Sequence, residues 1–238
     1  MHRTIEPAIQ YWGTPVVLVS TLCEDGRVNV APMSSAFWLG WTCMLGLDAT
    51  SLTVANLERE RSCVLNLASA ANADAVNALA LTTGAASVPL HKKLLGYRHE
   101  PDKLGVAGLS TLPSAVVPVP RIAECEVHLE AVVEKIRPFA RGDARMAIPA
   151  CSVELRIVQV HVEESLMLDA DKVDPARWTP LIMSFRRLFA RGAEVGPSRL
   201  ARGDEAAYAP WKAGLARRTA ARVLGAVAEV RYGIAEED

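Results

Sequence analysis

Hydroxyl side chains suited to holding an anion stand at two places in the first quarter of the sequence. Ser34 and Ser35 follow an apolar segment, and Thr53 stands near the start of a helix predicted for Ser51–Arg61. Hydroxyl groups donate hydrogen bonds to phosphate oxygens, and the helix dipole favours an anion at its N-terminus. These residues therefore predict a phosphate site. The alternatives are surface hydroxyls at Ser34 and Ser35 and a simple helix cap at Thr53.

Two segments contain lysines that can supply the positive charge for such a site. One is His91-Lys92-Lys93, from which we take Lys93, and the other is Asp102-Lys103, from which we take Lys103. A lysine ammonium neutralises a phosphate as a point charge. For Lys103 the alternative is a surface ion pair with Asp102, which is the commoner role of adjacent opposite charges.

Pro32 marks a place where backbone groups become available to a ligand. It follows Val28–Ala31, which predicts a strand. Proline has no N–H to donate to a ladder, so the strand must end, bulge or lie at a sheet edge there. We expect an interruption that frees the backbone groups around Ala31 and Met33 for the polar edge of a ligand.

Standard catalytic and metal-binding signatures are absent from the sequence. It contains no GxGxxG, Walker, GxSxG or HExxH pattern. The five histidines are dispersed, and none stands at metal-ligand spacing from another, which argues against a metal site. His128 stands between Glu126 and Glu130 in an alternating segment, and we expect it to face solvent. These patterns identify no catalytic residue.

Composition and charge indicate a globular intracellular protein. The 238 residues are 50% hydrophobic and 22% charged, which allows a sizeable core. The net charge of −1 gives no general attraction to nucleic acid or to anionic membranes. Five scattered cysteines without a CxxC pair argue against a disulfide framework and a zinc site. Because the sequence shows neither a secretion signal nor a membrane-spanning apolar run, we expect a cytoplasmic protein.

The elements that must position these residues are mostly strands in the first third of the chain. Pro15–Leu22 is rich in β-branched residues and leads to Asp25-Gly26, a dipeptide that predicts a hairpin with a type I′ turn. Trp41–Leu47 and Ser62–Leu67 predict further strands, and Ser51–Arg61 predicts the helix between them.

The middle of the chain combines a helix, a long loop and two long strands. Asn72–Leu81 predicts a helix, and residues 84–120 predict an ordered loop with a short helix, a length that usually indicates function. Alternation in Ala123–Lys135 and Ser152–Val162 predicts half-buried strands. The polar segment Arg141-Gly142-Asp143 predicts a loop between them.

The last quarter, from Asp174 onward, is predicted to consist mostly of turns and helix. Trp211–Arg231 has the apolar stripe of an amphipathic helix, which is expected to pack on the same domain or on a second subunit. Nucleic-acid binding by its arginines is an alternative, but the rest of the chain is not basic, which favours a solvated face. We therefore expect one domain over 1–200 and a C-terminal helical extension over 201–238.

Several segments, taken in order, carry a family resemblance. Residues 14–35 contain a strand, a hairpin and an Asn-x-x-Pro-x-Ser segment. The later segments are Thr53-Val54-Ala55-Asn56-Leu57, Val64-Leu65-Asn66-Leu67, Asp102-Lys103-Leu104, Ala107-Gly108-Leu109-Ser110, Pro120-Arg121-Ile122-Ala123-Glu124-Cys125 and Asp174-Pro175-Ala176-Arg177-Trp178-Thr179-Pro180-Leu181. With this order and spacing, the chain resembles the flavin reductase-like, FMN-binding split-barrel family over roughly residues 10–185.

The resemblance implies a mainly β fold, an FMN-binding split β-barrel with flanking helices, that holds FMN without a covalent bond. The cofactor-binding residues it implies, together with those argued above, are Asn29, Ala31, Pro32, Met33, Ser34, Ser35, Thr53, Asn56, Lys93 and Lys103. For Asn29 the alternative is a residue that merely flanks a turn. Trp38, Trp41 and Trp178 are expected either to wall the flavin or to pack in the core.

The function implied by the resemblance is an FMN-dependent oxidoreductase, a homodimer that accepts hydride from NAD(P)H and passes reducing equivalents to flavin or another acceptor. Flavin reductases of two-component monooxygenases often carry a late Gly-Asp-His segment associated with nicotinamide use. This sequence has Gly142-Asp143-Ala144 instead, without the histidine. The alternative function is therefore an FMN-binding electron carrier without hydride chemistry of its own.

Overall fold

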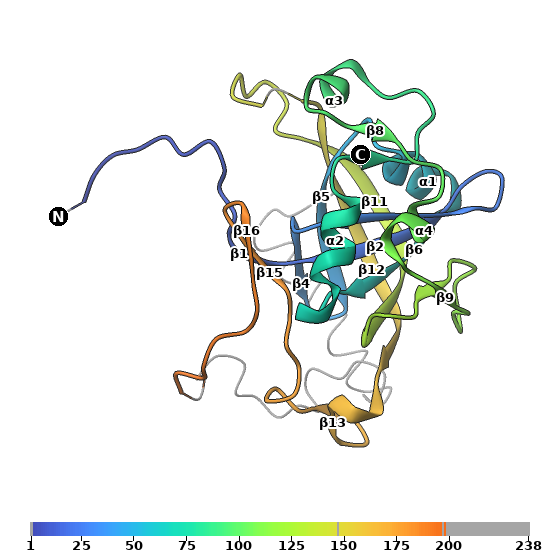
Figure 1. The fold of residues 1–238 in the computed structure, drawn as a ribbon, viewed down its shortest axis with the longest axis vertical. Coiled ribbons are helices and arrows are strands. Elements are labelled where there is room, and N and C mark those ends of the chain that lie inside the picture. Colours follow the sequence, from blue (N-terminus) through green and yellow to red (C-terminus); the bar gives the residue numbers. More distant parts are fainter. Residues whose placement is uncertain (1, 147, 197, 199–238) are drawn as a thin grey trace, which may run out of the picture. The chain divides into compact units, whose positions relative to one another are not determined.

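A seven-stranded antiparallel sheet, with strand order β3-β2-β6-β11-β12-β5-β4, forms the centre of the fold (Figure 1). The computed structural model describes residues 2–146, 148–196 and 198. The strands of this sheet are Val17–Leu22 (β2), Val28–Met33 (β3), Ala36–Leu39 (β4), Thr42–Asp48 (β5), Ser62–Leu67 (β6), Val127–Phe139 (β11) and Ala150–Val162 (β12). The mainly β architecture expected from the sequence is thereby confirmed.

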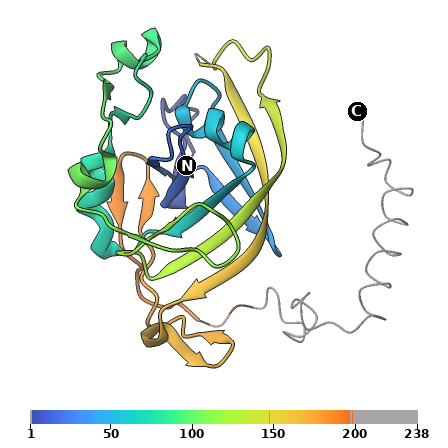
Figure 2. The same cartoon turned by 90° about the vertical axis from the view of Figure 1, so that its right-hand side faces the viewer.

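The main hydrophobic core lies between one face of this sheet and helix α1 (Leu52–Glu60). Because side chains alternate across a strand, Val19, Leu65 and Leu155 all face this core and are fully buried. Val54 and Leu57 of α1 complete the same cluster. In Figure 2 the long strands β11 and β12 curve past α1, so the helix is held on the inner side of the sheet.

Shorter elements surround the sheet. The remaining helices are Ala73–Leu79 (α2), Leu90–Leu94 (α3) and Lys103–Ala107 (α4), with 3₁₀ turns at Ala70–Asn72 and Glu164–Leu166. The short strands are Trp12–Pro15 (β1), Thr82–Thr83 (β7), Arg98–His99 (β8), Thr111–Leu112 (β9), Arg121–Ile122 (β10), Met167–Asp169 (β13), Lys172–Val173 (β14), Ile182–Ser184 (β15) and Arg187–Phe189 (β16). They form the sheets β1-β15-β16, β9-β10, β13-β14 and β7-β8.

The structure extends the predictions for the two less regular parts of the chain. The predicted loop over residues 84–120 contains two short helices, α3 and α4, and two two-residue strands, β8 and β9. After Asp174, where turns and helix were predicted, β15 and β16 form a hairpin that pairs with β1. These three-residue strands are too short to show an alternating pattern. The predicted helix Trp211–Arg231 and the extension 201–238 lie outside the described residues.

The β2–β3 hairpin forms as predicted, but its turn is different. Gly26 N donates to Cys23 O at 2.9 Å, Cys23 N donates to Arg27 O at 2.8 Å, and Gly26 alone within the turn has a positive φ, +80°. A type I′ turn needs positive φ at both central residues, so that prediction is wrong. The geometry is that of a type I turn followed by a glycine in the left-handed region.

Pro32 does not interrupt its strand. β3 stays paired with β2 through Met33, and Pro32 stands opposite Leu18. The reason is that β3 is an edge strand, so groups on its outer side have no ladder partner to lose. The expectation that Pro32 frees backbone groups around Ala31 and Met33 by breaking the pairing is therefore wrong, whereas the alternative of an edge position is correct.

The face of β11 that carries His128 and Glu130 is buried, which corrects the expectation that His128 faces solvent. His128 is 4% exposed and Glu130 is 0% exposed. Backbone N–H groups of residues 115–117 donate to the Glu130 carboxylate at 2.7–2.9 Å, and His161 Nε2 donates to it at 2.6 Å. Burial raises the pKa of Glu130, but these hydrogen bonds outweigh it and bring the pKa to about 2. The ionised Glu130 side chain thus holds residues 115–117 against strand β11 through these hydrogen bonds.

The described part of the chain shows no helix suited to a membrane, no candidate metal site and no disulfide. None of its helices combines the length and the apolar character needed to cross a membrane. It also shows no group of three or more His, Cys, Asp or Glu side chains placed to bind a metal ion. The five cysteines are free thiols.

Candidate functional site

A cleft of about 510 Å³ opens between strand β3, the first turn of α1, the end of α2 and helix α3, and we call it the β3–α1 cleft. Of the ten cofactor-binding residues predicted from the sequence, eight line it, namely Asn29, Ala31, Pro32, Met33, Ser34, Ser35, Thr53 and Lys103. Asn56 and Lys93 do not. The structure therefore gathers most of the predicted residues at one place, although they come from three separate stretches of sequence.

The first turn of α1 presents hydrogen-bond donors at the cleft. Ser51 is the N-cap, because its hydroxyl accepts a hydrogen bond from Val54 N at 3.2 Å. Thr53 is then the second helical residue, which makes the alternative of a helix cap at Thr53 wrong. Among the described residues, the backbone N–H groups of Leu52 and Thr53 have no hydrogen-bond acceptor. Such groups at a helix N-terminus favour an anion.

A buried polar cluster fixes the Thr53 hydroxyl. Asn29 Nδ2 donates to Thr53 Oγ1 at 3.2 Å and to Thr21 Oγ1 at 3.3 Å. Asn56 Nδ2 donates to the same Thr21 oxygen at 3.0 Å, so Asn56 supports the cluster from behind without reaching the cleft. Thr53 Oγ1 accepts a hydrogen bond from Asn29 and donates none to a protein atom in the described ranges. The hydroxyl proton of Thr53 is therefore available for a hydrogen bond to a ligand in the cleft.

Gly84 allows the chain to pass close to this cluster. A Cβ atom at Gly84 would lie 2.8 Å from Asn29 Oδ1 and 2.7 Å from Leu52 Cδ2. A larger residue would therefore push against the side chains that shape this end of the cleft. From the sequence, Gly84 was expected only to follow the end of the helix predicted for Asn72–Leu81 and to begin the loop over residues 84–120, because a close approach between distant segments leaves no local signal.

Lys103 brings an unbalanced positive charge into the cleft. Its side chain is 4% exposed, and Nζ donates to Val30 O on the outer edge of β3 at 2.9 Å. No carboxylate in the described part of the chain lies within ion-pair distance of it, so the alternative of a surface pair with Asp102 is wrong. Burial first, and then the charge of Lys92, lower the pKa of Lys103 to about 8. It remains mostly protonated at neutral pH.

Lys92, rather than the predicted Lys93, is the lysine of α3 that lines the cleft. Lys92 is buried and its Nζ lies 3.2 Å from Asp48 Oδ2, whereas Lys93 is exposed. The triplet His91-Lys92-Lys93 predicted a basic residue here but could not say which one points inward. The five-residue helix α3 decides this, and so short a helix has no readable periodicity.

Asp48 at the end of β5 was missed by the sequence analysis and organises this side of the cleft. His91 Nε2 lies 3.0 Å from its Oδ2, and Thr50 donates to its Oδ1 through N at 2.8 Å and Oγ1 at 2.7 Å. Burial raises the pKa of Asp48, but the bonds from His91 and Thr50 and the charge of Lys92 prevail and bring it to about 2. Asp48 is thus ionised and balances Lys92.

The tryptophans considered as walls for a ring system lie elsewhere. Trp38, Trp41 and Trp178 pack against the main hydrophobic core, and none of them lines the β3–α1 cleft. Its apolar wall consists of smaller side chains, including Val16, Val19, Met33, Leu79 and Met183. These three tryptophans therefore pack in the core, which was the alternative to walling the flavin.

Comparison with known proteins gives a consistent family assignment. Residues 10–190 match the Flavin reductase like domain. An uncharacterized protein of Bacillus subtilis (strain 168), YdfE, is 38% identical over 194 residues, which cover 82% of this chain and 91% of that protein. Nitrilotriacetate monooxygenase component B from Bacillus cereus has 18% identity and a TM-score of 0.66, over 83% of this chain and 99% of its own.

Flavoredoxin of Desulfovibrio vulgaris (Miyazaki F) has a similar structure, with 18% identity and a TM-score of 0.67. The match covers 84% of this chain and 99% of the flavoredoxin chain. These likenesses confirm the flavin reductase-like split-barrel fold that the resemblance implied, and the family match supports FMN as the cofactor. Because the family match covers more than half of the sequence, this chain belongs to the flavin reductase like domain family.

Proposed function

We propose that this chain is an FMN-dependent oxidoreductase of the flavin reductase-like type, which takes hydride from NAD(P)H and passes reducing equivalents to flavin or another acceptor. The observation that carries the proposal is Lys103, a buried ammonium in the β3–α1 cleft without a carboxylate partner in the described ranges. A buried charge is costly unless it is paired, so this site is built to receive an anion.

The residues of the cleft fit FMN. Lys103 would balance the phosphate, and the Thr53 hydroxyl with the free N–H groups of the first turn of α1 would donate to its oxygens. The partly exposed side chains of Met33, Leu81 and Met183 offer an apolar surface to a planar ring. The sequence has no glycine-rich dinucleotide fingerprint, which favours FMN over FAD. When bound, FMN supplies a ring that accepts a hydride and passes electrons on.

Substitution of Thr53 tests the phosphate contact. Thr53→Ala removes one hydrogen bond to a charged group, worth about 1.5–3 kcal/mol, and should weaken FMN binding about tenfold to hundredfold. Riboflavin has no phosphate, so its affinity should hardly change. Thr53→Ser keeps the hydroxyl and should bind FMN nearly as well as the wild-type protein. Fluorescence titration of both ligands measures this, and an equal loss for FMN and riboflavin in Thr53→Ala would contradict the assignment.

The pH dependence of FMN affinity tests Lys103. Its pKa of about 8 in the free protein should rise when an anion binds, so binding takes up a proton above that pH. Affinity should therefore be constant near pH 7 and fall as the pH rises through 8, since the phosphate stays dianionic there. Lys103→Met should bind FMN more weakly at pH 7, with little change up to pH 9. Wild-type protein with the same Kd at both pH values would argue against this role.

Anaerobic addition of NADH or NADPH tests the hydride step. We expect the absorption band of the bound flavin to bleach, as it does with a chemical reductant used as the control. The second candidate function, an electron carrier, is favoured by Ala144 following Gly142-Asp143. In the turn between β11 and β12, Asp143 is engaged by Arg145 through Nε and Nη2, both at 2.9 Å. Flavin that bleaches with the chemical reductant but with neither nucleotide would support the carrier instead.

We further propose that the protein is a homodimer, with an apolar patch next to the cleft as its interface. The patch comprises Trp12, Phe37, Leu39 and Phe185, which are 64%, 61%, 82% and 39% exposed. The rings of Trp12 and Phe185 lie 4.5 Å apart, and Phe37 and Leu39 belong to the edge strand β4. Exposed patches of large apolar side chains commonly mark protein interfaces.

Light scattering after size-exclusion chromatography tests this assembly. The wild-type protein should show twice the 25.7 kDa mass of one chain. Leu39→Glu places a charge in the patch and should yield monomers. Leu90→Glu is the matched control, because Leu90 on α3 is 72% exposed but lies outside the patch. A monomeric wild-type protein at micromolar concentration would refute the dimer.

A further inference from the structure

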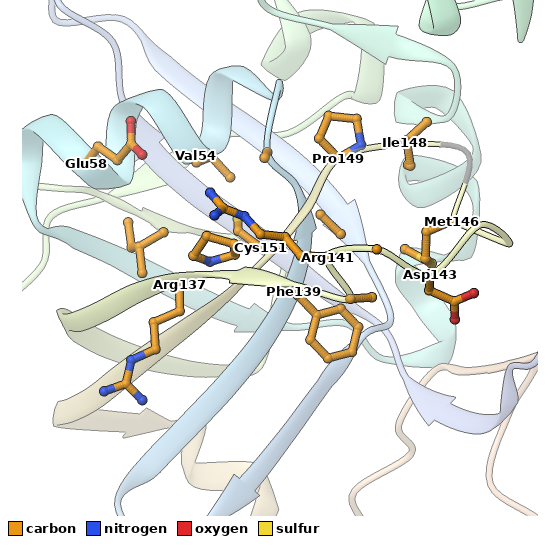
Figure 3. Close-up of a pocket in the computed structure, with 16 residues that line it drawn as sticks. Val54, Glu58, Arg137, Phe139, Arg141, Asp143, Met146, Ile148, Pro149 and Cys151 are labelled. Atoms are coloured by element: carbon orange, nitrogen blue, oxygen red, sulfur yellow. The ribbon is translucent and has the colours of Figure 1, made fainter. Parts of the chain in front are cut away.

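A second cavity of about 480 Å³ lies between the first two turns of α1 and the end of the β11–β12 hairpin (Figure 3). It is separate from the β3–α1 cleft but shares Ile148 with it. Consecutive residues of α1 face the two spaces, because Thr53 lines the cleft and Val54 lines the second cavity. Neither the family match nor the proposed function gives this cavity a role. Its size suits a small organic molecule.

Apolar side chains form one part of the cavity wall. Val54, Ile136, Ile148, Pro149 and Cys151 come from α1 and from the two arms of the hairpin. Burial, followed by the charges of Glu58 and Asp48, raises the pKa of the Cys151 thiol, so this side chain is neutral and acts as part of the apolar wall. Phe139, 56% exposed, adds an aromatic ring at the rim.

One guanidinium group extends over this apolar wall. Figure 3 shows the Arg141 side chain reaching across the cavity towards Val54 on α1, whereas Arg137 points away. In the part of the chain that the structure describes, Arg141 has no hydrogen-bond or ion-pair partner. The nearby carboxylate of Asp143 does not serve it, because Arg145 engages Asp143 through two hydrogen bonds. Arg141 is thus available to a ligand.

The opposite wall limits the charge of that ligand. Glu58 on α1 lines the same cavity and is not paired with a basic side chain among the described residues. A carboxylate ligand can bind the Arg141 fork in a bidentate manner. A second negative charge, as in a phosphate monoester or a dicarboxylate, would meet repulsion from Glu58.

We propose that this cavity binds a small aromatic monocarboxylate. Its carboxylate would be held by Arg141, and its ring would lie on the apolar wall formed by Val54, Ile136 and Pro149. The site does not depend on the function proposed for the β3–α1 cleft, since no group of the FMN phosphate site belongs to it.

Titration of the FMN-loaded protein with benzoate tests the site, with calorimetry as the readout. Benzoate should bind saturably with a Kd of about 1 mM or tighter, which is attainable for a ligand of this size. Arg141→Gln should weaken binding at least tenfold. Arg137→Gln is the matched control, because Arg137 lies on the same hairpin and its side chain points away from the cavity in Figure 3. It should bind benzoate like the wild-type protein.

Two related ligands test the chemistry of recognition. Benzamide has the same shape without the charge and should bind at least tenfold more weakly than benzoate. Phthalate carries a second carboxylate and should bind poorly to the wild-type protein but better to Glu58→Gln, in which the repulsion is removed. Melting curves of each variant check that the fold is retained.

Three results would overturn the proposal. They are the absence of saturable benzoate binding, an equal loss of affinity in Arg141→Gln and Arg137→Gln, and release of FMN by benzoate. The last would place benzoate in the β3–α1 cleft, and flavin fluorescence detects it directly. If the protein does not bind FMN, the same titrations are made without it, so failure of the proposed function and failure of this site remain distinguishable.

Discussion

The position of helix α1 at the end of strand β5 is the constraint on which both cavities depend. Ser51 N donates to Asp48 O at 3.0 Å and the Ser51 hydroxyl caps the helix, so the chain turns directly from strand to helix. At the other end, Arg61 adopts the left-handed conformation and its guanidinium donates to Val133 O at 2.8 Å. With both ends of α1 fixed, Thr53 faces the β3–α1 cleft and Val54 faces the second cavity. The helix therefore forms one wall of each space.

The edge position of β3 has consequences that extend well beyond the strand itself. Because no strand of the described residues pairs with its outer side, Pro32 is tolerated and Val30 O accepts a hydrogen bond from Lys103. This contact holds the start of α4 against the sheet and directs a buried ammonium group into the cleft. A paired β3 would have excluded both the proline and the lysine. The open sheet edge thus supplies the charge of the candidate cofactor site.

The sequence predicted what depends on local pattern and missed what depends on contact between distant segments. Alternation located β11 and β12, and capping preference located α1, because these signals lie within a few residues. Thr53 and Lys103 were predicted because hydroxyl and ammonium groups suit an anionic ligand, and Asn29 because of the family resemblance; all three line the cleft. Asp48 and Gly84 were missed, since their roles arise only when β5, α3 and the loop after α2 meet.

The same limit explains the error over β11. In an alternating strand, a face with Glu and His is usually exposed to solvent. Here residues 115–117 cover that face, and their three backbone N–H groups donate hydrogen bonds to Glu130. No local signal marks a loop that will lie on a strand some fifteen positions away in sequence. The Lys92–Lys93 error has a related cause, because α3 is too short for periodicity to orient its side chains.

Each of the two cavities contains a basic side chain that no carboxylate binds in the described residues. In the β3–α1 cleft, the single carboxylate Asp48 balances Lys92, which leaves Lys103 as the surplus cation. At the β11–β12 turn, Asp143 pairs with Arg145, so within the described residues Arg141 has no bound carboxylate, although Glu58 lines the same cavity. An unpaired charge costs more free energy at Lys103, which is buried and whose pKa is lowered by that burial, than at Arg141, which is exposed to solvent. The cleft therefore favours tight retention of an anionic cofactor, whereas the second cavity favours weaker, exchangeable binding of a singly charged ligand.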